Sequence, residues 1–202
     1  MRSPGTTVSH QTAPIGRDSF RLAAIRSSTL KLARLLFPVL ALAALAACAA
    51  DNYAPKGEPS FYRNLAQPGA ELDAAAAASM ISGYRANNDL PAVALDPVLM
   101  RLAQEQAEAM AKRDKLDHNA SKPFNTRLKA SGYDAKRAAE NIGAGYHTLA
   151  EAFSGWRDSP PHRSNMLLKG ATRMGIAAVY TPRSKYKVYW SLILAEPDVR
   201  KN

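Results

Sequence analysis

The chain has 202 residues, of which 47% are hydrophobic, and its 27 lysines and arginines against 17 acids give a formal net charge of +10. This length suits one domain with extensions, and the hydrophobic fraction is enough for a packed core. The composition excludes collagen, a coiled coil and wholesale disorder. The only cysteine is Cys48, which excludes a disulfide scaffold.

A basic leader carries half of the net charge. Residues 1–47 hold six basic residues and one acid, and the run 35–50 contains no charge. This apolar run is slightly too short to span a bilayer comfortably. A basic region, a short apolar region and small residues at its end are typical of a secretory signal. We therefore interpret residues 1–47 as a signal peptide.

The leader ends in Leu45-Ala46-Ala47-Cys48, which resembles the bacterial lipobox. In that motif the leader is cut before the cysteine and the thiol is acylated, so we predict lipidation at Cys48, with the membrane as a partner. The alternative is an uncleaved membrane anchor with an incidental thiol. Ala49 rather than aspartate follows, and resemblance to Gram-negative lipoproteins then implies an outer-membrane protein facing the periplasm.

The remaining chain divides by composition into three parts. Residues 48–70 contain three prolines and no apolar period, which predicts a tether. A folded domain is expected over 71–196, followed by a short tail over 197–202.

Four helices are predicted in the folded domain. Residues 72–87 are alanine-rich, and Asp96-Pro97 opens a second helix that reaches residue 112 with apolar residues at helical spacing. A short helix covers 123–131. Thr148 and Glu151 form a capping box for a helix that ends before Pro160. The segment 159–165 is expected to be a loop.

Strands are expected late in the chain. Residues 174–180 and 186–194 are rich in aromatic and branched residues, and a short strand is expected over 139–142. Early helices, late strands and no regular alternation indicate an α+β domain rather than a doubly wound sheet. Trp156 and Trp190 lie among apolar residues, which favours a place in the core.

Candidate polar residues have no decisive local spacing. His118, Glu140 and His162 each have an ordinary structural explanation, and no His-Glu-x-x-His zinc motif occurs. His147 precedes the cap residue Thr148 and is expected to be a solvated loop residue.

The order of the motifs carries more information than any one of them. Asp117-His118-Asn119 is followed by Ala139-Glu140-Asn141-Ile142-Gly143, by Trp156-Arg157-Asp158-Ser159-Pro160-Pro161-His162-Arg163-Ser164-Asn165 and by Met174-Gly175-Ile176-Ala177. This order resembles the CAP superfamily, the cysteine-rich secretory, antigen 5 and pathogenesis-related group, in its bacterial form. The resemblance runs from about residue 72 to residue 195.

The resemblance implies an α-β-α sandwich with a central antiparallel sheet and a cleft that carries two histidines and two glutamates. His118 and Glu140 match the first histidine and the first glutamate, and His162 matches the histidine of the bacterial form. Ser159 occupies the position of the second glutamate, so a full tetrad is absent. We expect Asn119, Asn141 and Asn165 to support the cleft.

Two chemistries remain open for this cleft. His118 and His162 could hold zinc or another divalent cation. A structural zinc site has four protein ligands and a catalytic zinc site usually has three. Two histidines alone therefore predict only weak, exchangeable binding. Ser159 could act as a nucleophile activated by a histidine. A serine before two prolines is more often a turn residue, and no Gly-x-Ser-x-Gly elbow is present.

The basic residues of the domain gather before the expected cleft strand: Lys112, Arg113, Lys115, Lys122, Arg127, Lys129, Lys136 and Arg137. An exported domain is not expected to bind nucleic acid, so anionic envelope polymers or lipid headgroups are better partners, and a solvated basic face is the default.

Three functions stay open for an exported, lipid-anchored chain. We favour a binding module for a small apolar, lipid-like or peptide ligand, with a divalent metal as an optional partner, over an enzyme. The alternatives are a metal-assisted hydrolase of envelope peptide or polymer, and a structural or interaction protein of the envelope.

Overall fold

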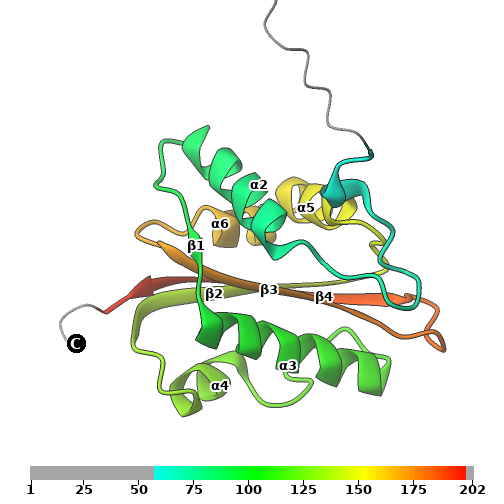
Figure 1. Cartoon of the computed structure of the whole chain (residues 1–202). Helices are drawn as coiled ribbons and strands as arrows, with labels where there is room; N and C mark the ends of the chain where they lie inside the picture. Colours follow the sequence, from blue (N-terminus) through cyan, green and yellow to red (C-terminus); the bar gives the residue numbers. More distant parts are fainter. Residues whose placement is uncertain (1–56, 199–202) are drawn as a thin grey trace, which may run out of the picture. The chain divides into compact units, whose positions relative to one another are not determined.

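The computed structural model describes residues 57–198 (Figure 1). The leader, Cys48 and the first part of the expected tether lie outside the described residues. Within 57–198, no helix is both long enough and apolar enough to cross a membrane. The domain is built around a four-stranded sheet of β1 (Ala94–Leu95), β2 (Ala135–Ala144), β3 (Arg173–Tyr180) and β4 (Val188–Pro197).

The strands lie in the order β1-β3-β4-β2. Strand β4 pairs antiparallel with both β2 and β3, while the two-residue β1 pairs parallel with β3. The expected antiparallel sheet is therefore confirmed for the three long strands, and the short β1 makes the sheet mixed. Strand β2 lies at the edge of this sheet, where one of its two sides is open to other parts of the chain.

Helices cover both faces of the sheet, which confirms the α+β sandwich. Figure 1 shows α2, α5 and α6 on one side of the strands and α3 and α4 on the other. Their bounds are Ser60–Tyr62 for the 3-10 helix η1, Ala74–Ala86 for α2, Pro97–Arg113 for α3, Phe124–Ala130 for α4, Leu149–Asp158 for α5 and Pro160–Met166 for α6.

Strand β4 is buried along both faces because both are covered. Its side chains alternate between two apolar clusters, as a period of two requires. Trp190 and Leu192 join the cluster under α2 and α5, whereas Ile193 and Ala195 join the cluster under α3. Trp156 of α5 meets Trp190 edge to face, with ring centroids 6.3 Å apart. Both tryptophans are core residues, as the sequence predicts.

Local signals place the starts of two helices correctly. The Asp96 side chain accepts hydrogen bonds from the backbone N–H groups of Val98 and Leu99, and Pro97 is the first helical residue of α3. Thr148 and Glu151 form the expected capping box of α5. Each cap satisfies backbone donors that would otherwise lack a partner.

The segment expected to be a loop at 159–165 is helical instead. A proline disfavours helical backbone in the residue before it, and Ser159 is indeed extended, so α5 ends there. Pro160 and Pro161 then occupy the first turn of α6, where their missing N–H groups cost nothing. Two short helices therefore replace one helix and a loop.

Part of the expected tether packs onto the domain. Leu65 is 4% exposed and belongs to the apolar cluster under α2 and α5. Its backbone N–H donates to the carbonyl of His147 at 2.7 Å. The folded part therefore begins before residue 71.

Arg85, near the end of α2, is fully buried among backbone carbonyls. Its Nε donates to Pro91, and its two terminal nitrogens donate to Met166, Leu168 and Ala171 at 2.8–3.0 Å. Burial lowers the pKa of this guanidinium. These bonds tie α2 to the segment that follows α6.

A bulge near the start of β2 brings two successive basic residues to one acid. The register shifts between Ala135 and Arg137. Lys136 and Arg137 both pair with Glu196 of β4, at 3.2 Å and 2.7 Å. In a regular strand, neighbouring side chains point to opposite faces, so the bulge makes this shared contact feasible.

We predict opposite effects for alanine at two glycines. A Cβ at Gly175 in β3 would overlap the backbone carbonyl of Leu99 in α3, whereas Gly83 in α2 has open space around it. Gly175→Ala should lower the free energy of unfolding by about 3 kcal/mol, because backbone cannot move aside easily. Gly83→Ala should raise it by about 0.5–1 kcal/mol through helix propensity. Urea unfolding of both variants checks this, and equal effects would contradict the packing described for β3.

Candidate functional site

Glu140 on β2 is the centre of the polar site. Its side chain is only 2% exposed, and both of its carboxylate oxygens are occupied. Oε1 accepts a hydrogen bond from the guanidinium of Arg127 at 2.7 Å, and Oε2 lies 2.9 Å from Nδ1 of His118. Because a carboxylate only accepts, Nδ1 of His118 carries the hydrogen and donates it.

Arg127 was predicted to lie on a basic surface, and this was wrong. It is 6% exposed, and besides its bond to Glu140 its Nε donates to the carbonyl of Lys122 at 3.0 Å. Helix α4 and the segment before it therefore hold the guanidinium against β2. A charged group at this depth needs such a partner, since an unpaired buried charge is strongly unfavourable.

Asn141 and Asn165 form a second group on the other side of β2. Nδ2 of Asn141 donates to the carbonyl of His162 at 2.9 Å. Nδ2 of Asn165 donates to the side-chain oxygen of Asn141 and to the carbonyl of Glu140, at 2.9 Å and 3.2 Å. These amides hold α6 against the free edge of β2. Asn119 differs, because its backbone N–H donates to Asp117.

His162 of α6 is held by Ser159, the residue just before that helix. Its Nδ1 lies 2.9 Å from the hydroxyl oxygen of Ser159, and that hydroxyl makes no cap bond to the helix. Pro161, the second helical residue, has no N–H to cap, and the hydroxyl contacts the imidazole of His162 rather than a backbone N–H. Burial, and secondarily the positive charge of His118, lowers the pKa of His162.

These residues meet around the edge of the sheet. Glu140 pairs with Ile193 in the register and Asn141 with Leu192, and these two partners belong to the apolar clusters on opposite faces. His118 therefore reaches β2 from the face of α3 and α4, and His162 reaches it from the face of α6. We call His118, Glu140, Ser159 and His162 the β2 cluster.

Similarity to known proteins identifies the family. A family model described as "CAP: Cysteine-rich secretory protein family" matches residues 78–194. The chain belongs to this family. The match includes every member of the β2 cluster and most of the sheet, so the CAP resemblance inferred from the motif order is confirmed.

One curated relative and several solved structures are also similar, the solved structures in fold. The chain is 28% identical over 103 residues to the uncharacterized protein YkwD of Bacillus subtilis, covering 50% of this chain and 40% of that protein. An extracellular SCP-domain protein from Bacillus anthracis has a TM-score of 0.53 and 21% identity, over 60% of this chain and 39% of its own. An outer surface protein from Borrelia burgdorferi has a TM-score of 0.57 and 16% identity, over 62% of this chain and 93% of its own. The chain thus spans well under half of the curated relative.

The donor set of this CAP domain does not fit a resident zinc ion. Within residues 57–198, no group of three or more histidine, cysteine, aspartate or glutamate side chains could hold a metal. Glu140 cannot add a ligand while Arg127 and His118 occupy its oxygens. At most two imidazoles remain, one fewer than a catalytic zinc site uses.

The site residues that sequence reasoning missed act through tertiary contacts. Arg127 resembles its basic neighbours in sequence, and only the packing of α4 against β2 distinguishes it. The polar contacts of the β2 cluster lie around a strand edge.

We predict that His162 titrates below its ordinary pKa of 6.5, because burial disfavours its charged form. His118→Asn should raise the pKa of His162, since it removes a neighbouring positive charge, while His147→Asn, at an exposed loop position, should not. NMR titration of the imidazole signals measures these values.

The lowered pKa of His162 also makes the stability of the fold depend on pH. As the pH falls, His162 takes up a proton at a higher pH in the unfolded chain than in the folded chain. The free energy of unfolding should therefore decrease as the pH drops below about 6.5. A His162→Asn variant should lose part of this dependence. A midpoint for His162 above 6.5 would contradict the burial described for it.

Proposed function

We propose that this CAP-family chain is an exported, lipid-anchored binding protein of the cell envelope, whose β2 cluster takes a small peptide ligand. The observation that carries the proposal is the placement of the two imidazoles. Each is held at Nδ1 by the protein, His118 by Glu140 and His162 by Ser159, which leaves Nε2 as the nitrogen for a ligand. Held side chains lose little freedom on binding, which favours recognition.

Binding is favoured over hydrolysis by the chemistry of the cluster. A metal-assisted hydrolase needs a held metal, and the described residues supply at most two ligands. Ser159 and His162 are within hydrogen-bond reach, as a nucleophile and its base must be. However, the bond to Ser159 occupies Nδ1 of His162, the position where a base normally receives its own orienting partner.

A peptide is favoured over an acyl chain by the polarity of the site. The β2 cluster consists of imidazoles, a carboxylate and a hydroxyl, and the two asparagines beside it are also polar. An acyl chain gains its affinity from apolar surface, which this group of residues does not offer. A peptide backbone offers both N–H donors and C=O acceptors, so it can bond to Nε2 of either imidazole.

We predict that the full-length chain, purified in detergent, retains members of a random hexapeptide pool. His118→Ala combined with His162→Ala should weaken retention about tenfold, because two hydrogen bonds of about 0.5–1.5 kcal/mol each are lost. His147→Ala is the matched control, because it removes an exposed imidazole outside the cluster. Mass spectrometry of the retained peptides measures the effect.

The outcomes of this experiment separate the three functions. Cleavage of the retained peptides would favour the hydrolase. Retention of co-purified lipid without peptide would favour the lipid-like ligand. If neither peptide nor lipid is retained, the structural role in the envelope would remain and the binding proposal would be contradicted.

Anchoring through Cys48 is a separate part of the proposal, supported by the lipobox and the leader before it. We predict that the wild-type chain partitions into the membrane fraction and that Cys48→Ser moves it to the soluble exported fraction. One acyl chain holds a protein only reversibly, whereas two signals hold it firmly. Fractionation with metabolic acyl labelling measures this, and in a Gram-negative host the label should appear in the outer membrane. Membrane retention of the unlabelled serine variant would indicate an uncleaved anchor.

A further inference from the structure

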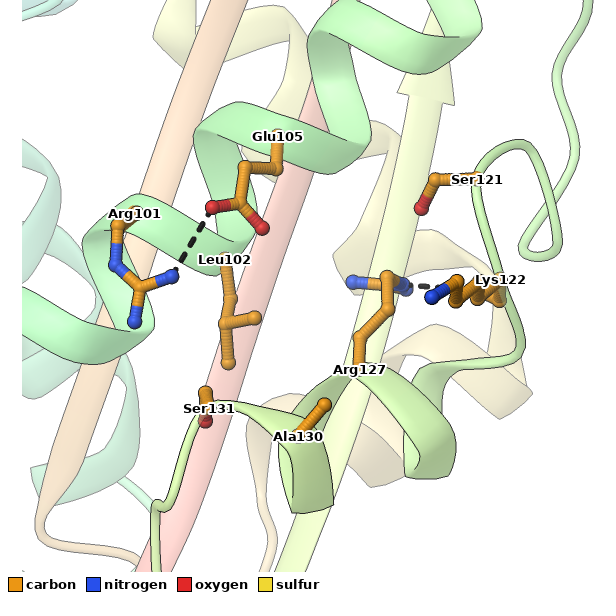
Figure 2. A pocket seen from close by; sticks show the side chains of 8 residues that line it. All are labelled: Arg101, Leu102, Glu105, Ser121, Lys122, Arg127, Ala130 and Ser131. Atoms are coloured by element: carbon orange, nitrogen blue, oxygen red, sulfur yellow. Dashed lines mark hydrogen bonds and ion pairs between the residues drawn. The ribbon is translucent and has the colours of Figure 1, made fainter.

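A second site lies beside Arg127, on the side of the domain away from α6. An open pocket of about 380 Å³ is lined by helices α3 and α4 and by the segment before α4 (Figure 2). This volume is within the range of small-molecule sites. Its walls combine the basic residues Arg101, Lys122 and Arg127 with the apolar Leu102 and Ala130. We call it the Arg127 pocket.

Arg127 has unused hydrogen-bonding capacity at this pocket. Its side chain is 5% exposed, its Nε donates to Lys122 and its NH2 group donates to Glu140. The remaining nitrogen, NH1, has no partner although it is buried. Figure 2 shows the guanidinium between Leu102 and Lys122, with a nitrogen directed toward the α3 wall of the pocket. A buried N–H without a partner is unfavourable, and an acceptor in the pocket would relieve it.

The charges around the pocket favour an anion. Three cationic side chains line it, and Glu105 is the acid among its lining residues. Glu105 is paired with Arg101 at 3.0 Å, but both are about half exposed, so this pair is weak and Arg101 can turn to another partner. Glu140 neutralises part of the Arg127 charge from the opposite side. The remaining positive excess is small, which suits a singly charged ligand.

We propose that the Arg127 pocket binds a small carboxylate on a short aliphatic body. The carboxylate accepts from NH1 of Arg127 and pairs with Lys122, and the aliphatic part contacts Leu102 and Ala130. A guanidinium and an ammonium group together provide directed donors for such an oxygen pair. This site is distinct from the β2 cluster and does not rest on the peptide-binding proposal, although Arg127 contacts both.

The test uses N-acetylalanine as the probe, with N-acetylalaninamide as its neutral counterpart. Calorimetric and NMR titration of the full-length chain in detergent should show binding of the acid and none of the amide. Lys122→Ala should weaken binding about fivefold, as expected for an exposed ion pair. Arg183→Ala is the matched control, because it removes one positive charge from an exposed residue of the β3–β4 loop.

A second pair of variants tests the pocket without altering Arg127. Ala130 is exposed at the end of α4 and lines the pocket. Ala130→Glu places a carboxylate in the pocket and should weaken binding of the probe at least about tenfold, by competition for the same cations. Ala130→Gln has nearly the same volume and should change binding much less.

The outcomes decide the proposal. Equal affinity for N-acetylalanine and N-acetylalaninamide would overturn it. An equal loss of affinity for N-acetylalanine in Ala130→Glu and Ala130→Gln would also overturn it. Binding of inorganic phosphate in place of the carboxylate would overturn the proposed ligand class. His162→Ala, which removes an imidazole whose side-chain partner is Ser159 and not Glu140, should leave binding of N-acetylalanine within about twofold. Failure of the peptide-binding proposal and failure of this one therefore give different results.

Discussion

The contact between Arg127 and Glu140 is the constraint on which the polar site depends. Both side chains are almost fully buried, and neither charge would be tolerated there without the other. The pair joins α4 to the edge strand β2, and through the second oxygen of Glu140 it fixes His118. The loop after α3, helix α4 and β2 must therefore assemble together before an oriented imidazole exists.

Elements with local signals were the ones predictable from sequence. Asp96-Pro97 and the pair Thr148 and Glu151 begin helices because their side chains bond the backbone a few residues away. Strands β3 and β4 follow from their branched and aromatic residues, whereas β2 contains only Ile142 of these types and extends well beyond the predicted 139–142. These features need little knowledge of the rest of the chain.

Features that depend on distant partners could not be predicted in the same way. Leu65 becomes a core residue only because α5 and the sheet offer an apolar surface to it. Arg85 appears in the sequence as the basic end of an alanine-rich helix, but in the fold it collects carbonyls from residues 91, 166, 168 and 171. For the candidate site, motif order predicted the histidines and Glu140, which stays a prediction, while Arg127 was indistinguishable in sequence from its exposed basic neighbours.

The start of β2 affects whether two copies of the protein can pair through their sheet edges. A sheet edge presents unpaired backbone groups that invite a foreign strand. At the bulge, Lys136 and Arg137 turn to Glu196 together, which breaks the regular spacing of those groups over the first residues of the strand. Farther along, Asn165 and Trp156 already occupy the outward carbonyls of Glu140 and Ile142. These contacts thus close part of the edge against strand-by-strand pairing between two copies of the protein.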